Sequence, residues 1–395
     1  METYRLKKMS ETKIVYRSLS MVYFLFFFGI GALYTLLPLY YQKFGLSGTQ
    51  IGTIMAVGPV ISILFQPVWG MICDRFQAEQ KVLACALTCA ASIALLFPLM
   101  HGFIAFLLLF AGLQLFQSAI NPITDSITLS FVQKQGGDYG NIRLFGAIGF
   151  AVAVWFTGTL AERFGLVVIF YVYAGAFLLG LWWVRQFPKV HREKTGSVWS
   201  GLGRLLRLPK YVIFLGSAFL IFGPMNAHNY YFSLLYTKIG GTVAGVGVAF
   251  LLFAGSEAPA MKVAGSLIRK YGILTILIVA GVVSALRWGW YASTPSAAWV
   301  IMLFFIQGMS VGLYLPAAAT FIREHAPREV QVTAQALYSS FGNGLGTMFT
   351  SFIGGVLYDR SGIFSTYLYF SFSTVVGILL VIAITVLNTR TSRQG

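Results

Sequence analysis

Residues 18–41 read SLSMVYFLFFFGIGALYTLLPLYY, a run of 24 residues without a charged side chain. A helix of about 20 apolar residues is long enough to cross the hydrocarbon core of a bilayer. The run lacks a small-residue cleavage site, so we expect a retained first membrane span rather than a signal peptide. This stretch alone indicates a membrane protein.

The composition of the whole chain leads to the same conclusion. Only 10% of the 395 residues are charged and 57% are apolar, whereas an average soluble domain has about 25% charged residues. Such a chain lacks the polar surface that a water-soluble fold needs. At roughly 33 residues for a span and its connection, the chain accommodates about twelve spans.

Apolar runs broken by glycine, proline or charge predict an all-α membrane protein with twelve transmembrane helices. The expected spans are residues 17–41, 49–72, 82–100, 103–131, 139–161, 166–187, 211–236, 243–265, 272–292, 298–321, 333–358 and 364–388. The longest polar interruption lies near the midpoint. We therefore expect an N-terminal six-helix bundle (1–187), a cytoplasmic central loop (188–210) and a C-terminal six-helix bundle (211–395).

Lysine and arginine are distributed unevenly between the two sides of these spans. The side that holds the N-terminus has 21, the opposite side has four, and three lie inside spans. Because cytoplasmic loops carry the excess of basic residues, both termini are predicted to be cytoplasmic, in a protein of the cytoplasmic membrane. The net charge of +16 then reflects topology, and we expect lipid rather than nucleic acid as the partner of these loops.

The two halves share an internal repeat. Gly158-Thr-Leu-Ala-Glu-Arg-Phe-Gly165 and Gly355-Val-Leu-Tyr-Asp-Arg-Ser-Gly362 show one pattern displaced by 197 residues. Gly70-Met-Ile-Cys-Asp-Arg75 and Gly265-Ser-Leu-Ile-Arg-Lys270 show a second at a displacement of 195. A displacement close to half the chain indicates a duplicated six-span unit, an architecture of secondary transporters.

The turn after the second span resembles the signature loop of the major facilitator superfamily. It combines Gly70, Asp74 and Arg75, while Gln77 stands where the family usually has glycine. The resemblance, together with twelve spans and a long central loop, implies two pseudo-symmetric bundles that work by alternating access. It also implies a role in conformational gating for Gly70, Asp74 and Arg75.

Five charged residues stand out within the expected spans: Asp125, Arg143, Glu257, Lys262 and Arg287. A charge near the bilayer centre costs roughly 2.5 to over 10 kcal/mol, so a retained one usually faces the bundle interior or a water-filled path. Lys262 lies about three residues from a span end, where its long side chain can reach the interface. The other four are candidate functional residues.

Asp125 and Arg143 lie 18 residues apart around a polar turn near Lys134. In an antiparallel hairpin, each is about nine residues from the bend, which puts both on the order of 13 Å deep. They can therefore meet. Such a pair can bind a solute, since arginine grips hydroxyls or carboxylates with two donors, or it can be a structural ion pair.

The sequence around this pair resembles the lactose permease, phenylpropionate permease and nucleoside proton symporter group. The matching strings are Pro122-Ile-Thr-Asp125-Ser and Asp138-Tyr-Gly-Asn-Ile-Arg143-Leu-Phe-Gly-Ala-Ile-Gly-Phe150. In the lactose permease, an acid and an arginine at this spacing bind sugar hydroxyls, and an aromatic seven residues later stacks on the sugar. The resemblance implies that Asp125, Arg143 and Phe150 bind substrate. Phe150 replaces a tryptophan, so galactoside specificity is not implied.

The C-terminal half resembles the phenylpropionate permease branch at three places: Glu257, Leu286-Arg287-Trp288-Gly289 and Ala227-His228-Asn229-Tyr230-Tyr231. The resemblance implies further substrate-binding and proton-coupling residues. For substrate they are His228, Tyr231, Glu257 and Trp288; for protons they are Glu257, Arg287, Asp125 and His228. A histidine that titrates near neutral pH and a satisfied core histidine both fit His228.

Two features bear on coupling. Glu257 and Arg287 lie about 8 and 15 residues from their cytoplasmic ends, an offset of about 10 Å, so they either touch or hold water or a substrate group between them. The lactose permease has a coupling histidine and glutamate where Gln307 and Ser310 stand here. Neither of these two side chains titrates.

We expect a proton-coupled symporter that takes up a glycoside, a nucleoside or an aromatic acid, and that works as a monomer without a cofactor or metal. A phosphate-binding G-x-x-x-x-G-K-[ST] loop is absent, which disfavours an ATP-driven pump. The fifth span lacks the Gly-Pro motif of antiporters, and the four histidines are too scattered for an enzyme. An efflux antiporter and a transporter-derived sensor remain alternatives. Cys73, Cys85 and Cys89 are expected to be packing residues.

Overall fold

The computed structural model describes residues 2–136, 138–187 and 202–391, and these contain helices and connections but no strand. The elements are α1 (Glu2–Tyr34), α2 (Leu37–Lys43), α3 (Gly48–Phe76), α4 (Glu79–Leu96), η1 (Phe97–Leu99), α5 (Phe103–Gln135), α6 (Tyr139–Phe164), α7 (Val168–Val184), α8 (Leu202–Leu205), α9 (Pro209–Lys238), α10 (Val243–Tyr271), α11 (Ile273–Ala292), α12 (Ala297–Met302), α13 (Phe305–His325), η3 (Arg328–Val330), α14 (Gln331–Ser339), η4 (Ser340–Gly346), α15 (Thr347–Ser361) and α16 (Ile363–Thr391). Residues 188–201 of the expected central loop lie outside the described residues.

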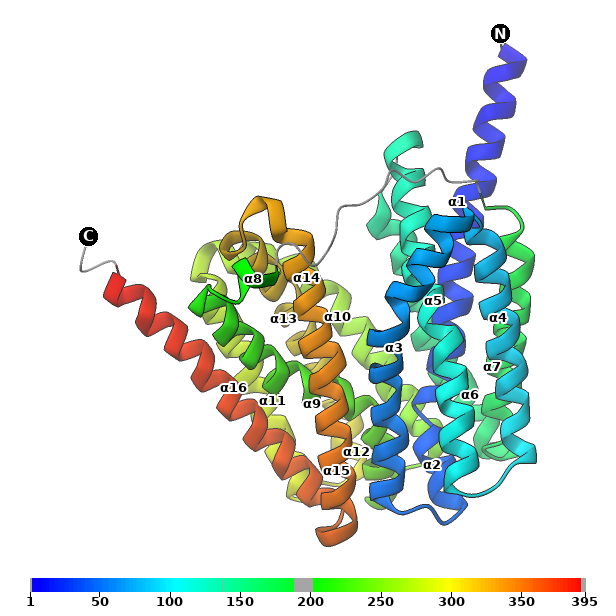
Figure 1. Cartoon of the computed structure of the whole chain (residues 1–395). Helices are drawn as coiled ribbons and strands as arrows, with labels where there is room; N and C mark the ends of the chain where they lie inside the picture. The colour runs from blue at the N-terminus through cyan, green and yellow to red at the C-terminus, as the bar shows by residue number, and fades with distance from the viewer. Residues whose placement is uncertain (1, 137, 188–201, 392–395) are drawn as a thin grey trace. The chain divides into compact units, whose positions relative to one another are not determined.

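The helices form two compact units. Unit 1 comprises Met1–Phe44 and Ile61–Lys194, and unit 2 comprises Gly45–Val60 and Thr195–Gly395. Within unit 1, α1 packs against α6 and α7, and α4 packs against α5 and α7 (Figure 1). Within unit 2, α10 packs against α13, α11 against α16, and α9 against α16 and η4.

Ten helices of the described chain are long and apolar enough to cross a membrane. The expected span 166–187 corresponds to the shorter apolar helix α7, and the expected span 333–358 to α14, η4 and α15 in succession. The segment η4 is π-helical and contains three buried glycines. The predicted all-α membrane fold is therefore confirmed.

The first expected span, 17–41, is divided into two helices. Helix α1 ends at Tyr34 and α2 begins at Leu37, with Pro38 in its first turn. Proline has no N–H to donate, and its ring clashes with the carbonyl four residues earlier, which here is that of Tyr34. Proline kinks or breaks a helix at such a position, and here the break falls between Tyr34 and Leu37.

The internal repeat is visible in the way four helices end. Gly165 after α6 and Gly362 after α15 have φ of +86° and +83°, and Gly272 after α10 has +86°. At the corresponding place after α3, Gln77 has φ of +46°. Each of the four donates its N–H to the carbonyl four residues earlier, at 2.8–2.9 Å. Glycine adopts positive φ without strain, whereas Gln77 does so at a cost.

Glycines let two helix pairs approach closely. On α6, a Cβ at Gly149 would collide with the backbone carbonyl of Phe24 on α1. On α13, a Cβ at Gly308 would collide with the backbone carbonyl of Phe253 on α10. Both contacts are with backbone atoms, which cannot move aside easily. The absence of a side chain at these two glycines therefore allows α6 to lie close to α1 and α13 to lie close to α10.

The three cysteines occupy different environments. Cys73 on α3 is buried, as expected of a packing residue, whereas Cys85 on α4 is exposed and Cys89 is partly exposed. The Sγ atoms of Cys85 and Cys89 are 3.9 Å apart, one helical turn along α4.

Candidate functional site

Asp125 is the centre of a polar cluster in unit 1. Its half-buried carboxylate, on α5, accepts hydrogen bonds from the hydroxyl of Tyr23 on α1 and from that of Tyr139 on α6, the latter at 2.9 Å. The side-chain amide of Asn121 donates to the other carboxylate oxygen at 3.2 Å. Three helices thus supply donors to one acid.

Arg143 lies beside this cluster, and its guanidinium group contacts aromatic rings, not the carboxylate of Asp125. Its guanidinium carbon is 4.3 Å from the ring centroid of Phe27 and 5.4 Å from that of Tyr23. Among the described residues, no Arg143 nitrogen lies within 4.0 Å of an Asp125 oxygen. The direct pair that the spacing allows is therefore replaced by Tyr23, whose hydroxyl binds the acid and whose ring faces the arginine.

The close packing of α1 on α6 makes this arrangement possible. A Cβ at Gly146 would clash with the ring of Phe27 and approach Arg143 to 3.1 Å, so the missing side chain leaves room for the stacked pair. Phe150, half-buried, lies seven residues after Arg143 on α6. Seven residues are about two helical turns, which places Phe150 on the same face as Arg143.

A second cluster lies in unit 2 around Arg287. This arginine on α11 is 5% exposed, and its Nη1 donates a hydrogen bond to Oε1 of Gln307 on α13, which is 1% exposed. Its guanidinium carbon lies 4.1 Å from the ring centroid of Trp288. Gln307, a residue that does not titrate, is therefore a direct partner of the buried cation.

His228 on α9 is fully buried next to Arg287's aromatic neighbours. Its Nδ1 lies 2.9 Å from the hydroxyl oxygen of Tyr367 on α16, and its ring centroid lies 4.7 Å from that of Trp288. The structure thus brings together three of the residues singled out in the C-terminal half: His228, Arg287 and Trp288.

Glu257 is half-buried on α10, and its backbone faces Gly308 on α13. It therefore lies beside the residue that follows Gln307, the partner of Arg287. Ser310, the other non-titrating replacement, is buried and donates its hydroxyl to the Gln307 carbonyl at 2.9 Å. Lys262, further along α10, is exposed, in keeping with its interpretation as an interfacial side chain.

Tyr231 takes part in helix packing. It is 1% exposed, and its hydroxyl donates to the backbone carbonyl of Ser351 on α15 at 2.5 Å. Its ring contacts that of Phe370 at a centroid distance of 5.9 Å. The hydroxyl that the resemblance assigns to substrate is thus bound to protein backbone here.

The turn with the signature resemblance lies at the end of α3. Asp74 and Arg75 are exposed, and the Arg75 guanidinium carbon is 5.7 Å from the ring centroid of Phe76. A Cβ at Gly70 would meet open space, so no close packing requires glycine there. The turn closes at Gln77 with its positive φ.

Sequence reasoning missed the contact of Asp359, at the end of α15. Its carboxylate accepts hydrogen bonds from the backbone N–H of Gly48 at 2.5 Å and of Thr49 at 2.7 Å, at the N-terminus of α3. Desolvation alone would raise the pKa of Asp359, but hydrogen bonds from Thr49, Gly48 and Ser47 outweigh it and hold the pKa below its usual value. A negative charge also suits a helix N-terminus.

The arrangement can bind a polar solute. The described residues contain no group of three or more His, Cys, Asp or Glu side chains placed to hold a metal ion. What they provide is a carboxylate surrounded by hydroxyl and amide donors, and two arginines stacked on aromatic rings. Such groups hold hydroxyls, carboxylates and ring faces.

Comparison with known proteins identifies similar chains. The model of the MFS_1 like family matches residues 16–369. A maltose permease of Geobacillus stearothermophilus is 41% identical over 362 residues, which cover 91% of this chain and 92% of the permease. A probable 3-phenylpropionic acid transporter of Escherichia coli (strain K12) is 26% identical, over 88% of this chain and 92% of the transporter.

Solved structures show the same fold. The crystal structure of the nucleoside transporter NupG superimposes with a TM-score of 0.84, covering 94% of this chain and 99% of the other at 16% identity. At that identity the likeness concerns the arrangement of helices and leaves the transported solute open.

Proposed function

The chain belongs to the MFS_1 like family and is an integral membrane transporter, and on this premise we propose that it takes up a small hydroxylated solute by proton-coupled symport. The solute is bound by the polar clusters described above and is exposed to the two sides of the membrane in turn, as alternating access requires. Both termini face the cytoplasm of the cell, because 21 of the 28 basic residues lie on the side of the N-terminus.

The cluster around Asp125 is the single observation that supports a hydroxylated solute most directly. The acid already accepts hydrogen bonds from Tyr23, Tyr139 and Asn121, all of which are groups that a sugar hydroxyl can replace or join. The ring of Phe27 and the half-buried Phe150 offer apolar faces nearby. A carboxylate among neutral donors and rings suits a polyhydroxy ring better than a second anion.

A glycoside of the maltose type is the proposed solute. The maltose permease is 41% identical to this chain over nearly the whole length of both. In this proposal Asp125 and Arg143 bind hydroxyls, and Phe150 covers a ring face. For unit 2 by itself, the proposed substrate-binding residues are His228, Glu257 and Trp288. Tyr231 positions α9 against α15, and its hydroxyl reaches solute only if it leaves the Ser351 carbonyl.

We assign proton coupling to Glu257 and Asp125, with His228 as a third titratable group. Arg287 cannot release a proton at accessible pH, and its partner Gln307 does not titrate. Arg287 instead supplies a buried positive charge, which influences the protonation of the titratable groups near it. Gly70, Asp74 and Arg75 act in the conformational change, at the exposed end of α3.

An aromatic acid is a second candidate, and one contact favours it. In the described residues Arg143 has no carboxylate within 4.0 Å, and two aromatic rings flank its guanidinium. A solute carboxylate could therefore bind Arg143 without displacing an ion pair. The 26% identity to the probable 3-phenylpropionic acid transporter agrees with this alternative.

Uptake by proteoliposomes tests the proposal. Maltose, uridine and 3-phenylpropionate are offered under an inward proton gradient, under a sodium gradient, and with a protonophore. We expect maltose to accumulate with the proton gradient only. Accumulation of 3-phenylpropionate alone would establish the second candidate, and binding without accumulation in any gradient would indicate a sensor.

Matched variants locate the site in the same assay. Arg143→Ala is expected to lower maltose uptake about tenfold or more, since charged hydrogen bonds contribute about 1.5–3 kcal/mol. Arg163→Ala, at the exposed other end of α6, is expected to retain uptake.

Glu257→Gln should abolish the alkalinisation of the medium that accompanies uptake, and unchanged alkalinisation would remove Glu257 from coupling.

A further inference from the structure

A cavity of about 350 Å³ lies at one end of unit 2, and none of its lining residues belongs to the cluster around Arg287. Its lining comes from the start of α9, the end of α13 and the end of α16. The lining residues are Leu208, Pro209, Lys210, Tyr211, His325 and Leu387. We call this space the α9–α13–α16 cavity.

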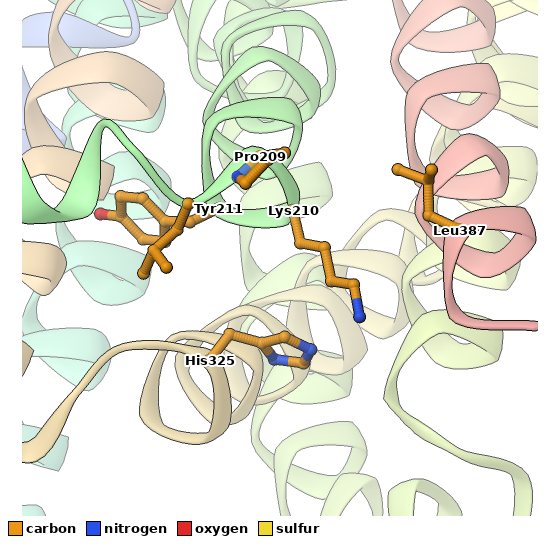
Figure 2. A pocket seen from close by; sticks show the side chains of 6 residues that line it. Pro209, Lys210, Tyr211, His325 and Leu387 are labelled. Carbon is orange, nitrogen blue, oxygen red and sulfur yellow. The ribbon is translucent and has the colours of Figure 1, made fainter. Parts of the chain in front are cut away.

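Two basic side chains share this cavity with apolar ones. Figure 2 shows the side chains of Lys210 and His325 extending toward the same space, with Leu387 on the opposite side. Lys210 and His325 are each partly exposed, so a ligand can reach them. Tyr211 is fully buried and donates its hydroxyl to the Ala334 carbonyl at 2.7 Å, so it forms a wall and is not itself available to a ligand.

The contacts of His325 engage one of its two ring nitrogens. Its Nδ1 lies 3.0 Å from the carbonyl oxygen of Phe321, and its ring stacks on that of Phe321 with centroids 4.0 Å apart. A carbonyl oxygen only accepts, so Nδ1 carries the hydrogen. Nε2 is left for a second partner, and it is a donor when the ring is protonated.

The start of α9 adds positive potential. Its N-cap, Leu208, provides no side-chain hydrogen bond to the first turn, and Pro209 occupies the first position. A helix N-terminus carries about half a positive charge and favours anions. The adjoining segments contain Arg204, Arg207 and Arg323 against Glu324 and Glu329, and the Arg204–Glu329 pair at 3.6 Å is solvent-exposed.

We propose that the α9–α13–α16 cavity holds the headgroup of an anionic phospholipid, with its phosphate between Lys210 and His325 and its acyl chains along Leu208 and Leu387. The apolar part of the lining favours a lipid over a free phosphate ion, which has no apolar part to bury. The proposal rests on the topology given above, which places this end of unit 2 at the cytoplasmic leaflet, where anionic lipids create a negative surface potential.

Native mass spectrometry of the whole protein tests this, without solute and in a detergent that has no sugar headgroup. Phosphatidylglycerol and phosphatidylcholine of matched chain length are added at equal concentration. We expect selective retention of phosphatidylglycerol. The double variant Lys210→Gln/His325→Gln should bind it about tenfold more weakly, as expected for loss of charged hydrogen bonds. Lys270→Gln, at the exposed end of α10, is the matched control.

Each other outcome overturns the proposal. Equal retention of the two lipids, or equal loss in Lys270→Gln, would mean that no specific site exists here. Displacement of phosphatidylglycerol by millimolar inorganic phosphate would identify a free-anion site instead. The variant Lys210→Arg/His325→Gln keeps one positive charge and should bind more phosphatidylglycerol than Lys210→Gln/His325→Gln does. If the variants and the wild type unfold at the same temperature without lipid, misfolding is excluded as the cause of weaker binding. Because no transport is measured, failure here would leave the proposed solute untouched.

Discussion

The hydroxyl of Tyr23 donates a hydrogen bond to the carboxylate of Asp125, 102 residues further along the chain. The ring of the same tyrosine lies 5.4 Å from the guanidinium carbon of Arg143. Tyr23 therefore connects the acid and the base on which substrate binding is proposed to depend. A change at this one position should affect both.

Replacing Tyr23 by phenylalanine removes the donor and keeps the ring. We expect the KM for maltose uptake to rise roughly three- to tenfold, because a hydrogen bond to a charged group contributes about 1.5–3 kcal/mol and water can replace part of it. Tyr23→Ala, which also removes the surface beneath Arg143, should have a larger effect. Tyr16→Phe, two turns earlier on α1, is the control, and an equal effect there would contradict the assignment.

The positive φ of Gln77 predicts a stabilising substitution. Gln77→Gly should raise the free energy of unfolding by about 0.5–1 kcal/mol, because glycine adopts this backbone conformation without strain. Gly272→Ala, at the corresponding place of the second half, should lower it by a similar amount. Thermal unfolding in detergent measures both. Shifts of the same sign would contradict the explanation.

Gly308 is predicted to tolerate no side chain. Gly308→Ala places a Cβ against the Phe253 carbonyl and should destabilise by about 1–3 kcal/mol, as overpacked sites do. Gly255→Ala on α10 is the matched control, because its Cβ would meet nothing within 4 Å. That change should be neutral or slightly stabilising, since alanine favours helix. Unfolding midpoints of the two variants are compared at equal protein and detergent concentration.

The contact of Asp359 with the start of α3 predicts a pH-dependent contribution to stability. The pKa of Asp359 is held below its usual value, so its contribution is present above the unfolded pKa of about 3.9 and is lost as the pH falls through the lower folded pKa. Asp359→Asn should therefore lower the unfolding temperature by a constant amount between about pH 5 and 8.

Below about pH 4 the difference between this variant and the wild type should shrink. Glu324→Gln, an exposed acid of the same unit, controls for general loss of charge. A difference that grew on acidification would show that Asp359 has a raised pKa and would contradict the hydrogen bonds assigned to it.

Local sequence could identify part of the site. Asn121 and Tyr139 precede Asp125 and Arg143 by four residues each, a spacing that places side chains on one face of a helix. Phe150 follows from the same periodicity. Tyr23, by contrast, reaches Asp125 from a helix 102 residues away, and only the packing of α1 against α5 and α6 brings it there.

The second cluster shows the same limit. The sequence identified Arg287, Trp288 and His228 separately, but their partners Gln307 and Tyr367 come from other helices. Hydrophobic periodicity places a residue on a face of its own helix and contains no information on which helix lies opposite. The fold class was predictable because lipid imposes helices on any apolar span, whatever its neighbours.

The pair of thiols on α4 gives the protein a built-in point of attachment. Cys85 and Cys89 lie one turn apart with 3.9 Å between their sulfur atoms, and Cys73 is buried. A reagent with two thiol-reactive groups can bond to both cysteines across that turn. A spin label or fluorophore attached in this way has little rotational freedom relative to α4. Motions of unit 1 could then be followed by spectroscopy in the native sequence, with only a second label introduced elsewhere.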